Sequence, residues 1–168
     1  MTEPPWVGVE PLAAHHDTAT FVSGRESVDA WFRDKALANA HTVSTYVCVD
    51  EQAQVCAFFA LRAIVVNVSA APGRLKRAGD DEGMAPAVLL AQMGVHERHQ
   101  RQGHGSRLFF RAVQEAVTAY TAIRIPLLVL DAADEDLVSF YEKLAMKRIP
   151  NTLRLAALIH KIPPPSGG

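Results

Sequence analysis

The sequence predicts a protein of the α/β or α+β class, in which strands and helices alternate along the chain. Residues 44–50 and 54–66 are β-branched and aromatic runs joined by a short turn, which predicts an antiparallel hairpin. Residues 126–130 form a continuous apolar run, which is typical of a central strand covered on both faces. Residues 105–120 and 134–144 instead carry apolar side chains at helical spacing. Strands and helices therefore alternate along the chain.

The amino-terminal part of the chain predicts one strand and one helix. Residues 6–12 read as the first strand, which a proline confines to an edge or a strand end. Ser23, with Glu26 three residues later, fits a capping box that satisfies free N–H groups at the start of a helix. We expect this helix to run to about residue 40, with its apolar residues on one stripe.

The rest of the chain completes the order β-α-β-β-β-α-β-α-β-β. Residues 70–86 hold three glycines and two prolines and are the longest expected loop. An apolar strand at residues 88–95 leads through a charged loop into the helix of residues 105–120. Asp134 is the expected N-cap of the next helix. Its apolar side chains repeat at i, i+3, i+4 and i+7 as Leu137, Phe140, Tyr141 and Leu144. The expected final strands are residues 147–149 and 153–162.

Composition excludes several classes of protein. A length of 168 residues predicts one domain, and the net charge of −1 argues against coating nucleic acid or membrane with the whole surface. No segment reaches ~18 uninterrupted apolar residues, so we expect a cytoplasmic protein. Cys48 and Cys56 form no zinc pattern, and no metal is expected. We expect two buried thiols, with a hairpin disulfide as the alternative.

The loop between the apolar strand and the helix has the composition of an anion-binding site. Gly103 and Gly105 allow the backbone to approach a ligand closely. Between Arg98 and Arg111 there are four arginines and no acidic residue. The free N–H groups and the dipole of the helix N-terminus also favour negative charge. The alternative is an ordinary glycine turn flanked by solvated arginines.

The spacing of the glycines separates this loop from two common nucleotide-binding motifs. A Walker A motif needs a lysine after the last glycine, and a dinucleotide fingerprint needs a third glycine where Leu108 stands. The segment Gln100-Arg-Gln-Gly-His-Gly105 instead resembles the Gln/Arg-x-x-Gly-x-Gly/Ala loop of the GNAT family of acyl-coenzyme A N-acyltransferases. The element order resembles the GNAT fold over residues 6–162. This resemblance implies a mixed central sheet of about six to seven strands with helices on both faces, in a single acetyltransferase domain. It also implies a disordered tail at residues 163–168.

The GNAT resemblance implies an acetyl-CoA site with splayed strands around it. In this family the strand before the loop offers free backbone groups to the pantetheine arm, and Gly94 within that strand is consistent with a bulge or a close approach. Arg98 and Arg101 are the expected partners of the coenzyme A phosphates. The full set of cofactor-binding residues that the resemblance implies is Met93, Gly94, Val95, Arg98, Arg101, Gln102, Gly103, His104, Gly105 and Ser106.

Tyr141 is the expected catalytic residue. The segment Ser139-Phe-Tyr141 resembles the Phe-Tyr motif of the family, whose tyrosine commonly protonates the sulfur of coenzyme A. A phenol remains protonated at neutral pH and can therefore donate. The alternative is a core tyrosine, because Tyr141 also lies on the apolar stripe. The Gly-Phe that usually follows the motif is replaced by Ala145 and Met146, so the sequence does not determine where this helix ends.

The sequence indicates no clear general base. His96, Glu97 and His99 lie near the loop, and each is more often a solvated residue than a base. An α-amino group has a pKa near 7 to 8, so an acceptor of this kind needs little help to lose its proton.

A second resemblance concerns the acceptor. Residues 21–24, 28–32 and 44–50, together with the strand at 89–95, resemble the pattern of the GNAT toxins of toxin–antitoxin pairs. This resemblance implies acetylation of the α-amino group of aminoacyl-tRNA, a block of translation and a ribbon-helix-helix antitoxin as a partner, and it allows a homodimer. The candidate basic residues for tRNA are Arg74, Lys76, Arg77, the arginines of residues 98–111, Lys143, Lys147 and Arg148.

Three functions stay open at the level of the sequence. The first is a toxin that acetylates aminoacyl-tRNA. The second is a GNAT enzyme for a small amine or for a protein amino terminus. The third is a GNAT-fold module that binds without catalysis.

Overall fold

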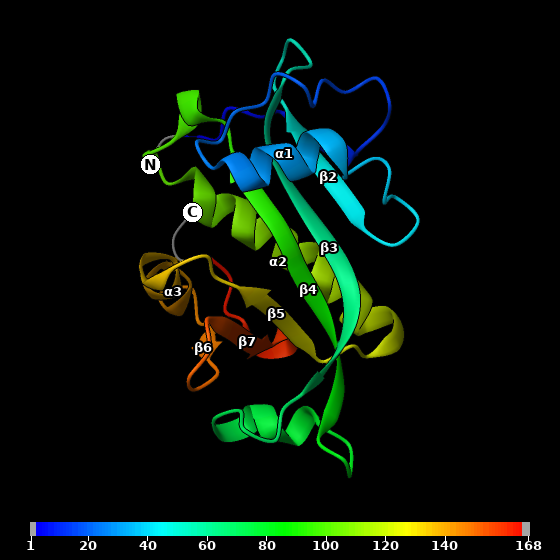
Figure 1. Ribbon diagram of the computed structural model, residues 1–168, viewed down its shortest axis with the longest axis vertical. Helices are drawn as coiled ribbons and strands as arrows, with labels where there is room; N and C mark the ends of the chain where they lie inside the picture. The colour runs from blue at the N-terminus through cyan, green and yellow to red at the C-terminus, as the bar shows by residue number, and fades with distance from the viewer. Residues whose placement is uncertain (1–2, 166–168) are drawn as a thin grey trace. The chain divides into compact units, whose positions relative to one another are not determined.

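The computed structural model describes residues 3–165, and its elements follow the predicted order (Figure 1). The strands are β1 (Gly8–Pro11), β2 (Ser44–Val49), β3 (Val55–Asn67), β4 (Met84–Val95), β5 (Leu127–Asp131), β6 (Lys147–Arg148) and β7 (Arg154–Leu158). The α-helices are α1 (Glu26–Asp34), α2 (His104–Ile123) and α3 (Glu135–Glu142). The short 3₁₀ turns are η1 (Gly73–Ala78), η2 (Glu97–His99) and η3 (Ile159–Lys161).

The strands form one seven-stranded mixed sheet in the order β1-β2-β3-β4-β5-β7-β6, which confirms the predicted class. β1 pairs with β2, β2 with β3, β5 with β7 and β6 with β7, all antiparallel. β4 and β5 are parallel, as their connection through α2 requires. Among the described residues, this parallel pairing runs only from Ala87–Leu127 to Leu89–Val129, although both strands continue beyond it. So short a paired region agrees with the expected separation of the strands around the acetyl-CoA site.

The chain divides into two compact units. The first comprises Met1–Arg62 with Ala91–Arg111, and the second comprises Ala63–Leu90 with Ala112–Gly168. The expectation of one acetyltransferase domain over residues 6–162 stays a prediction. Within the described residues, no helix is both long enough and apolar enough to cross a membrane.

An aromatic cluster beneath α1 forms the core of the first unit. The Phe32 ring on α1 stacks on the Phe58 ring of β3 at 4.0 Å between centroids, and Phe21 meets both rings edge-on. On the opposite face of the hairpin, Tyr46 stacks on Phe59. α1 and the first turns of α2 lie on opposite sides of β3 and β4 in this unit (Figure 1). The predicted helices on both faces are therefore present here.

The start of α1 differs from the predicted capping box. Its N-cap is Arg25 rather than Ser23, and the helix ends at Asp34 instead of near residue 40. The Ser23 backbone N–H donates to both oxygens of the buried Asp29 carboxylate, at 2.9 and 3.1 Å. The Ser23 hydroxyl accepts from the Arg25 N–H. The predicted cap was wrong because the Asp29 carboxylate, on the first turn of the helix, binds the backbone of Ser23. Ser23 is thereby held in the segment before the helix, and Arg25 takes the N-cap position.

The two cysteines of the first unit are free and buried, which confirms the expected thiols over the alternative disulfide. Cys48 lies on β2, and the Cys56 thiol on β3 donates to the Cys48 carbonyl at 3.2 Å. Burial raises the pKa of Cys56 to about 11 and raises the pKa of Cys48 further.

The core of the second unit lies between the β5–β7 pair and η1. Leu127 and Val129 of β5 are fully buried, and η1 adds the side chain of Leu75 to the same cluster. The long segment predicted as a loop is therefore ordered, because a buried leucine holds η1 on the sheet. β4 also begins at Met84, earlier than expected, because the Val68 N–H bonds the Gly83 carbonyl just before it.

α3 begins as the sequence predicts. The Asp134 carboxylate accepts from the Leu137 N–H at 2.9 Å and caps the helix. Val138 and Tyr141 are its buried residues. Of the expected tail, residues 163–165 form no regular structure and are exposed, and residues 166–168 lie outside the described residues.

Candidate active site

All ten residues expected to bind the cofactor lie in the first unit, between the end of β4 and the first turn of α2. β4 ends at Val95, η2 follows, and α2 begins at His104, one residue earlier than expected. The first turn of α2 contains no acidic residue. No negative side chain in this turn therefore compensates the free backbone N–H groups and the positive end of the helix dipole. This arrangement suits an anion.

The side chain of Gln100 holds the loop in place. Its amide nitrogen donates to the Val95 carbonyl at 2.8 Å and to the Ser23 carbonyl, so the loop is tied both to β4 and to the segment before α1. Arg101 and Gly103 then take left-handed conformations, with φ of 65° and 80°. A Cβ at Gly103 would meet nothing within 4 Å, so this glycine serves the turn and leaves the loop open to a ligand.

Gly94 is needed for packing in addition to any approach to a ligand. A Cβ at this position would lie 3.2 Å from Phe58 Cε1 and 3.3 Å from Val28 Cγ1. A Cβ at Gly94 would thus be directed toward α1, where only the hydrogen of glycine fits. The sequence predicts a bulge or a close approach at Gly94, and the structure adds a steric reason that the sequence could not reveal.

His104 contributes backbone rather than side chain to the loop surface. The imidazole is 2% exposed and meets the Trp6 ring edge-on. Its Nδ1 lies 3.1 Å from Arg107 Nη1 and accepts from that guanidinium, which leaves the proton on Nε2 to donate to Gln102 Oε1 at 3.2 Å. The His104 and Gln102 side chains therefore satisfy each other. Burial, followed by the charge of Arg107, lowers the pKa of His104.

The two arginines expected to bind phosphate differ in their surroundings. Arg98 is exposed, and its guanidinium donates to His99 Nε2 at 3.0 Å and to Gln54 Oε1 at 3.4 Å. Arg101 is exposed and makes no hydrogen bond or ion pair within residues 3–165. Both charges are available, and Arg101 needs to break no contact to reach an anion.

The histidines beside the loop are neutral at pH 7. Burial, followed by the charge of Arg98, lowers the pKa values of His96 and His99. Both rings also accept hydrogen bonds from Arg98, His96 at Nδ1 and His99 at Nε2. Glu97, the other candidate base, is exposed, and its backbone N–H bonds the Val22 carbonyl. No described contact singles out one of the three as a general base.

Tyr141 lies in the second unit, on the buried face of α3, with 8% of its surface exposed. Its carbonyl accepts from the N–H groups of Leu144 and Met146 and ends the helix. Ala145 takes a left-handed conformation with φ of 73°, and Met146 is 1% exposed. Ala145 and Met146 thus occupy the turn and the core position where the family motif usually has glycine and phenylalanine.

Several polar contacts had no signal in the sequence. Glu135 forms a bidentate ion pair with Arg148, with both N–O distances at 2.7 Å. The charge of Arg148, a candidate for tRNA binding, is therefore already neutralised. In the first unit, His16 accepts from the Ala13 N–H and donates to Glu10 at 2.6 Å. Glu10, His15 and His16 are the described residues that could gather around a metal ion, but the hydrogen bonds of His16 already occupy both ring nitrogens. These pairs form only when the folded chain brings the two side chains together, so the sequence alone does not reveal them.

The comparisons with known proteins agree with the fold and with the loop. The chain matches the family described as "Acetyltransferase (GNAT) family" over residues 12–146. The chain belongs to this family. The GNAT match extends from the end of β1, through the glycine loop, to the turn that follows α3. The predicted GNAT fold and acetyltransferase class are confirmed.

Two GNAT relatives carry names that refer to toxins. The chain is 32% identical over 127 residues to the "tRNA-acetylating toxin" of Mycobacterium tuberculosis, covering 74% of this chain and 75% of the relative. It is 27% identical over 154 residues to the "Probable toxin TacT" of Sinorhizobium fredii, covering 85% of each chain.

Solved GNAT structures share the fold at lower identity. AtaT complexed with acetyl-methionyl-tRNAfMet superimposes with a TM-score of 0.83 at 21% identity, over 92% of this chain and 96% of AtaT. A mutant AtaT toxin bound to the C-terminus of the antitoxin AtaR and to acetyl-CoA gives a TM-score of 0.75 at 20% identity, over 92% and 94% of the two chains.

Proposed function

We propose that this protein is a toxin that uses acetyl-CoA to acetylate the α-amino group of aminoacyl-tRNA and so blocks translation. The observation that carries the proposal is the relative named for tRNA acetylation, which is 32% identical over three quarters of each chain. AtaT, whose structure includes acetyl-methionyl-tRNAfMet, supports the same acceptor through the shared fold. The proposal implies a cytoplasmic protein, because aminoacyl-tRNA is used there.

The loop and the first turn of α2 fit the phosphates of acetyl-CoA, which supplies the activated acetyl group when bound. The backbone N–H groups from Arg101 to Ser106 would hold the pyrophosphate, with no acidic side chain nearby in the first turn. Arg101 would add a charge that has no other partner in residues 3–165, and Arg98 would add a second. The edge formed by Met93 to Val95 would bind the pantetheine arm.

Tyr141 would act as the general acid. Its Oη would hold a proton and pass it to the departing sulfur, so that coenzyme A leaves as a neutral thiol. The amine would lose its own proton to water, because an α-amino group with a pKa of about 7.7–8.0 is partly neutral at pH 7. A dedicated base is therefore unnecessary for this acceptor, in agreement with the lack of a distinct one among His96, Glu97 and His99.

The partners follow from the same proposal. A ribbon-helix-helix antitoxin would bind and silence the enzyme, and the AtaT structure with the C-terminus of AtaR supports an antitoxin partner for this class of protein. A homodimer is the proposed assembly. The basic candidates for tRNA remain Arg74, Lys76, Arg77, the arginines of residues 98–111, Lys143 and Lys147, whereas Arg148 is paired with Glu135.

One experiment tests the acceptor directly. The purified protein is offered labelled acetyl-CoA with charged tRNA, with deacylated tRNA and with a panel of free amines. We expect label on charged tRNA alone, in a form released when the aminoacyl ester is hydrolysed. Label on free amines or on a protein amino terminus without label on tRNA would favour the small-amine reading. No transfer to any acceptor would favour the binding module.

A further inference from the structure

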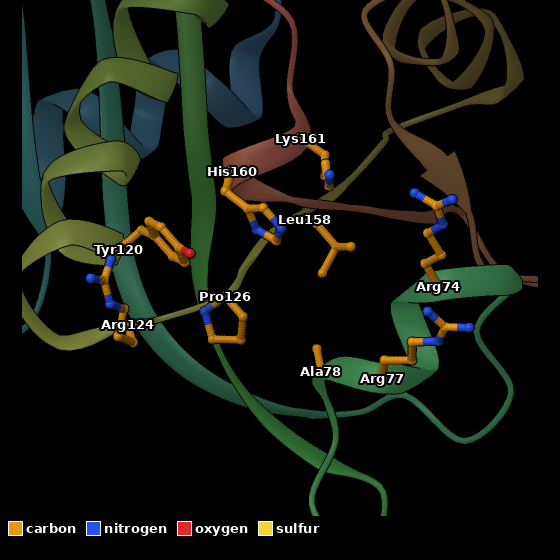
Figure 2. Close-up of a pocket in the computed structure, with 9 residues that line it drawn as sticks. All are labelled: Arg74, Arg77, Ala78, Tyr120, Arg124, Pro126, Leu158, His160 and Lys161. Carbon is orange, nitrogen blue, oxygen red and sulfur yellow. The ribbon is translucent and has the colours of Figure 1, made fainter.

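A pocket of about 500 Å³ in the second unit lies apart from the residues of the proposed acetyl transfer. The end of α2, the start of β5, η1 and η3 enclose it (Figure 2). Pro126 lines the pocket and directly precedes the first residue of β5. α3, which carries Tyr141, follows the last residue of the same strand. Five residues of strand, about 16 Å, separate the two ends. The pocket is therefore not a part of the surface around Tyr141.

Cationic side chains dominate the pocket wall. Arg74 and Arg77 project from η1 on one side of the pocket, Arg124 lies on the opposite side, and Lys161 of η3 lies between them (Figure 2). Among the described residues that line the pocket, none is acidic. Within residues 3–165, none of these four cations forms an ion pair with a carboxylate. Four uncompensated positive charges around one hollow attract a ligand with at least one phosphate.

A stack of flat groups forms the wall opposite Arg77. The Tyr120 and His160 rings are parallel within 16° and 5.3 Å apart, and the Arg124 guanidinium lies 5.0 Å from the centre of the Tyr120 ring. Figure 2 shows Arg124 and His160 on different sides of Tyr120. His160 is exposed, so its ring offers a free flat surface to a further aromatic group. Ala78, Pro126 and Leu158 provide an apolar floor.

Arg124 owes its place in the stack to an unusual backbone. α2 ends at Ile123, and the Arg124 N–H bonds the Tyr120 carbonyl at 2.8 Å. Arg124 itself takes a left-handed conformation with φ of 56°, where helices usually place glycine. This conformation turns the side chain back over Tyr120. A strained residue at the rim of a charged pocket is consistent with a role beyond ending the helix.

We propose that this pocket binds a nucleotide, with the base stacked on His160 and the phosphate held by Arg74 and Arg77. Stacking surfaces combined with cations are the features by which proteins hold single-stranded nucleic acids and free nucleotides. A second hollow of about 510 Å³ shares Arg74, Leu158 and Lys161 with the first and gives room for a neighbouring nucleotide. The nucleotide comes either from an RNA strand or from a free nucleoside diphosphate. Because Arg74 and Arg77 are also basic candidates for tRNA, the strand as the source rests on the proposed function, whereas the free nucleotide does not.

Fluorescence anisotropy tests the site with two probes, a labelled single-stranded RNA of ten nucleotides and a labelled ADP. The variants are Arg74→Ala combined with Arg77→Ala, and His160→Ala. Arg62→Ala, at an exposed arginine of β3 in the first unit, is the matched control. We expect tenfold or weaker binding in the double variant, at least fivefold weaker binding in His160→Ala, and wild-type binding in the control. The melting curve of each variant verifies that it is folded.

Salt dependence and competition sharpen the assignment. Loss of two phosphate contacts should flatten the slope of log affinity against log salt by about 1.4 for the RNA probe. Excess unlabelled ADP that displaces the RNA at micromolar concentration indicates a free nucleotide as the source, whereas competition by RNA alone indicates a strand. Both results support the site.

Three outcomes would overturn the proposal. Pyrophosphate that competes as well as ADP would show that no base is recognised. Wild-type affinity in the double variant would show that the arginines are ordinary solvated charges. Binding that is lost in Arg101→Ala but retained in the double variant would assign the nucleotide to the loop before α2. Because the readout is binding, a failure here leaves the acetyl-transfer result unaffected.

Discussion

Tyr141 is the single residue on which the proposed chemistry depends most. Tyr141→Phe removes only the hydroxyl and keeps a ring that is 8% exposed and packed on the buried face of α3. We expect kcat for acetyl transfer to fall by about 10²- to 10⁴-fold, the range that a general acid contributes. The melting temperature should stay close to that of the native protein. Initial rates with charged tRNA measure the loss.

Tyr46→Phe is the matched control, because it removes a hydroxyl from a tyrosine of β2 that stacks on Phe59. Its kcat should equal that of the native protein. Equal activity of both variants would remove Tyr141 from the mechanism and return it to the role of a core tyrosine.

The histidines near the loop predict how stability responds to pH. Burial lowers the pKa values of His96, His99 and His104 below the ordinary value of 6.5. The unfolded chain then binds protons at a pH where the folded chain does not. Their contribution to stability is therefore complete above pH 6.5 and is lost as the pH falls below it.

We expect the melting temperature to fall between pH 7 and pH 5, and His104→Gln to reduce that fall. His41→Gln, at an exposed histidine, should leave the pH dependence unchanged. A melting temperature that is flat or rises toward pH 5 would contradict the lowered pKa values of these three histidines.

At the scale of an element, Gln100 determines the shape of the loop before α2. Gln100→Ala removes the hydrogen bonds to the Val95 and Ser23 carbonyls, each of which contributes about 0.5–1.5 kcal/mol to stability. We expect KM for acetyl-CoA to rise on the order of tenfold, because the loop loses its preorganised shape. Gln114→Ala, at an exposed glutamine of α2, should change neither stability nor KM. An unchanged KM in Gln100→Ala would mean that the loop does not bind the cofactor.

The contact between β4 and α1 predicts a second effect at this scale. Gly94→Ala would force a methyl group to within 3.2 Å of the Phe58 ring, and overpacking of this kind costs about 1–3 kcal/mol. Gly8→Ala on β1 is the control, because its Cβ would meet Val49 at an ordinary 3.8 Å. We expect denaturant unfolding to show a loss of stability for Gly94→Ala only. Equal stability of the two variants would show that α1 can move away from β4.

At the scale of the whole molecule, local patterns predicted the order of elements well. Strand alternation, apolar stripes and the Asp134 cap are encoded within a few residues, and each appears in the structure. The start of α1 and the ordering of residues 70–86 were not predictable in this way. They depend on the Asp29 carboxylate and on the burial of Leu75, which are contacts made only after the chain folds.

The candidate site divides in the same manner. The glycine spacing and the Phe-Tyr segment indicated a GNAT enzyme, because backbone conformation and chemistry restrict those residues directly. The burial of His104, the tether of Gln100 and the steric limit at Gly94 needed three-dimensional neighbours that no sequence spacing reveals. The pairing of Arg148 with Glu135 likewise removes a charge that the sequence offered to tRNA.

The reactivity of the two buried thiols of the β2–β3 hairpin measures the rate at which this hairpin opens. A disulfide reagent attacks only a thiolate, and burial keeps Cys56, with a pKa of about 11, and Cys48 protonated at neutral pH. Labelling must then wait until the hairpin opens. We expect the rate of labelling to be independent of reagent concentration at high reagent, and to rise steeply with denaturant. The native thiols would thus report how often β2 and β3 separate, with no need to introduce a cysteine.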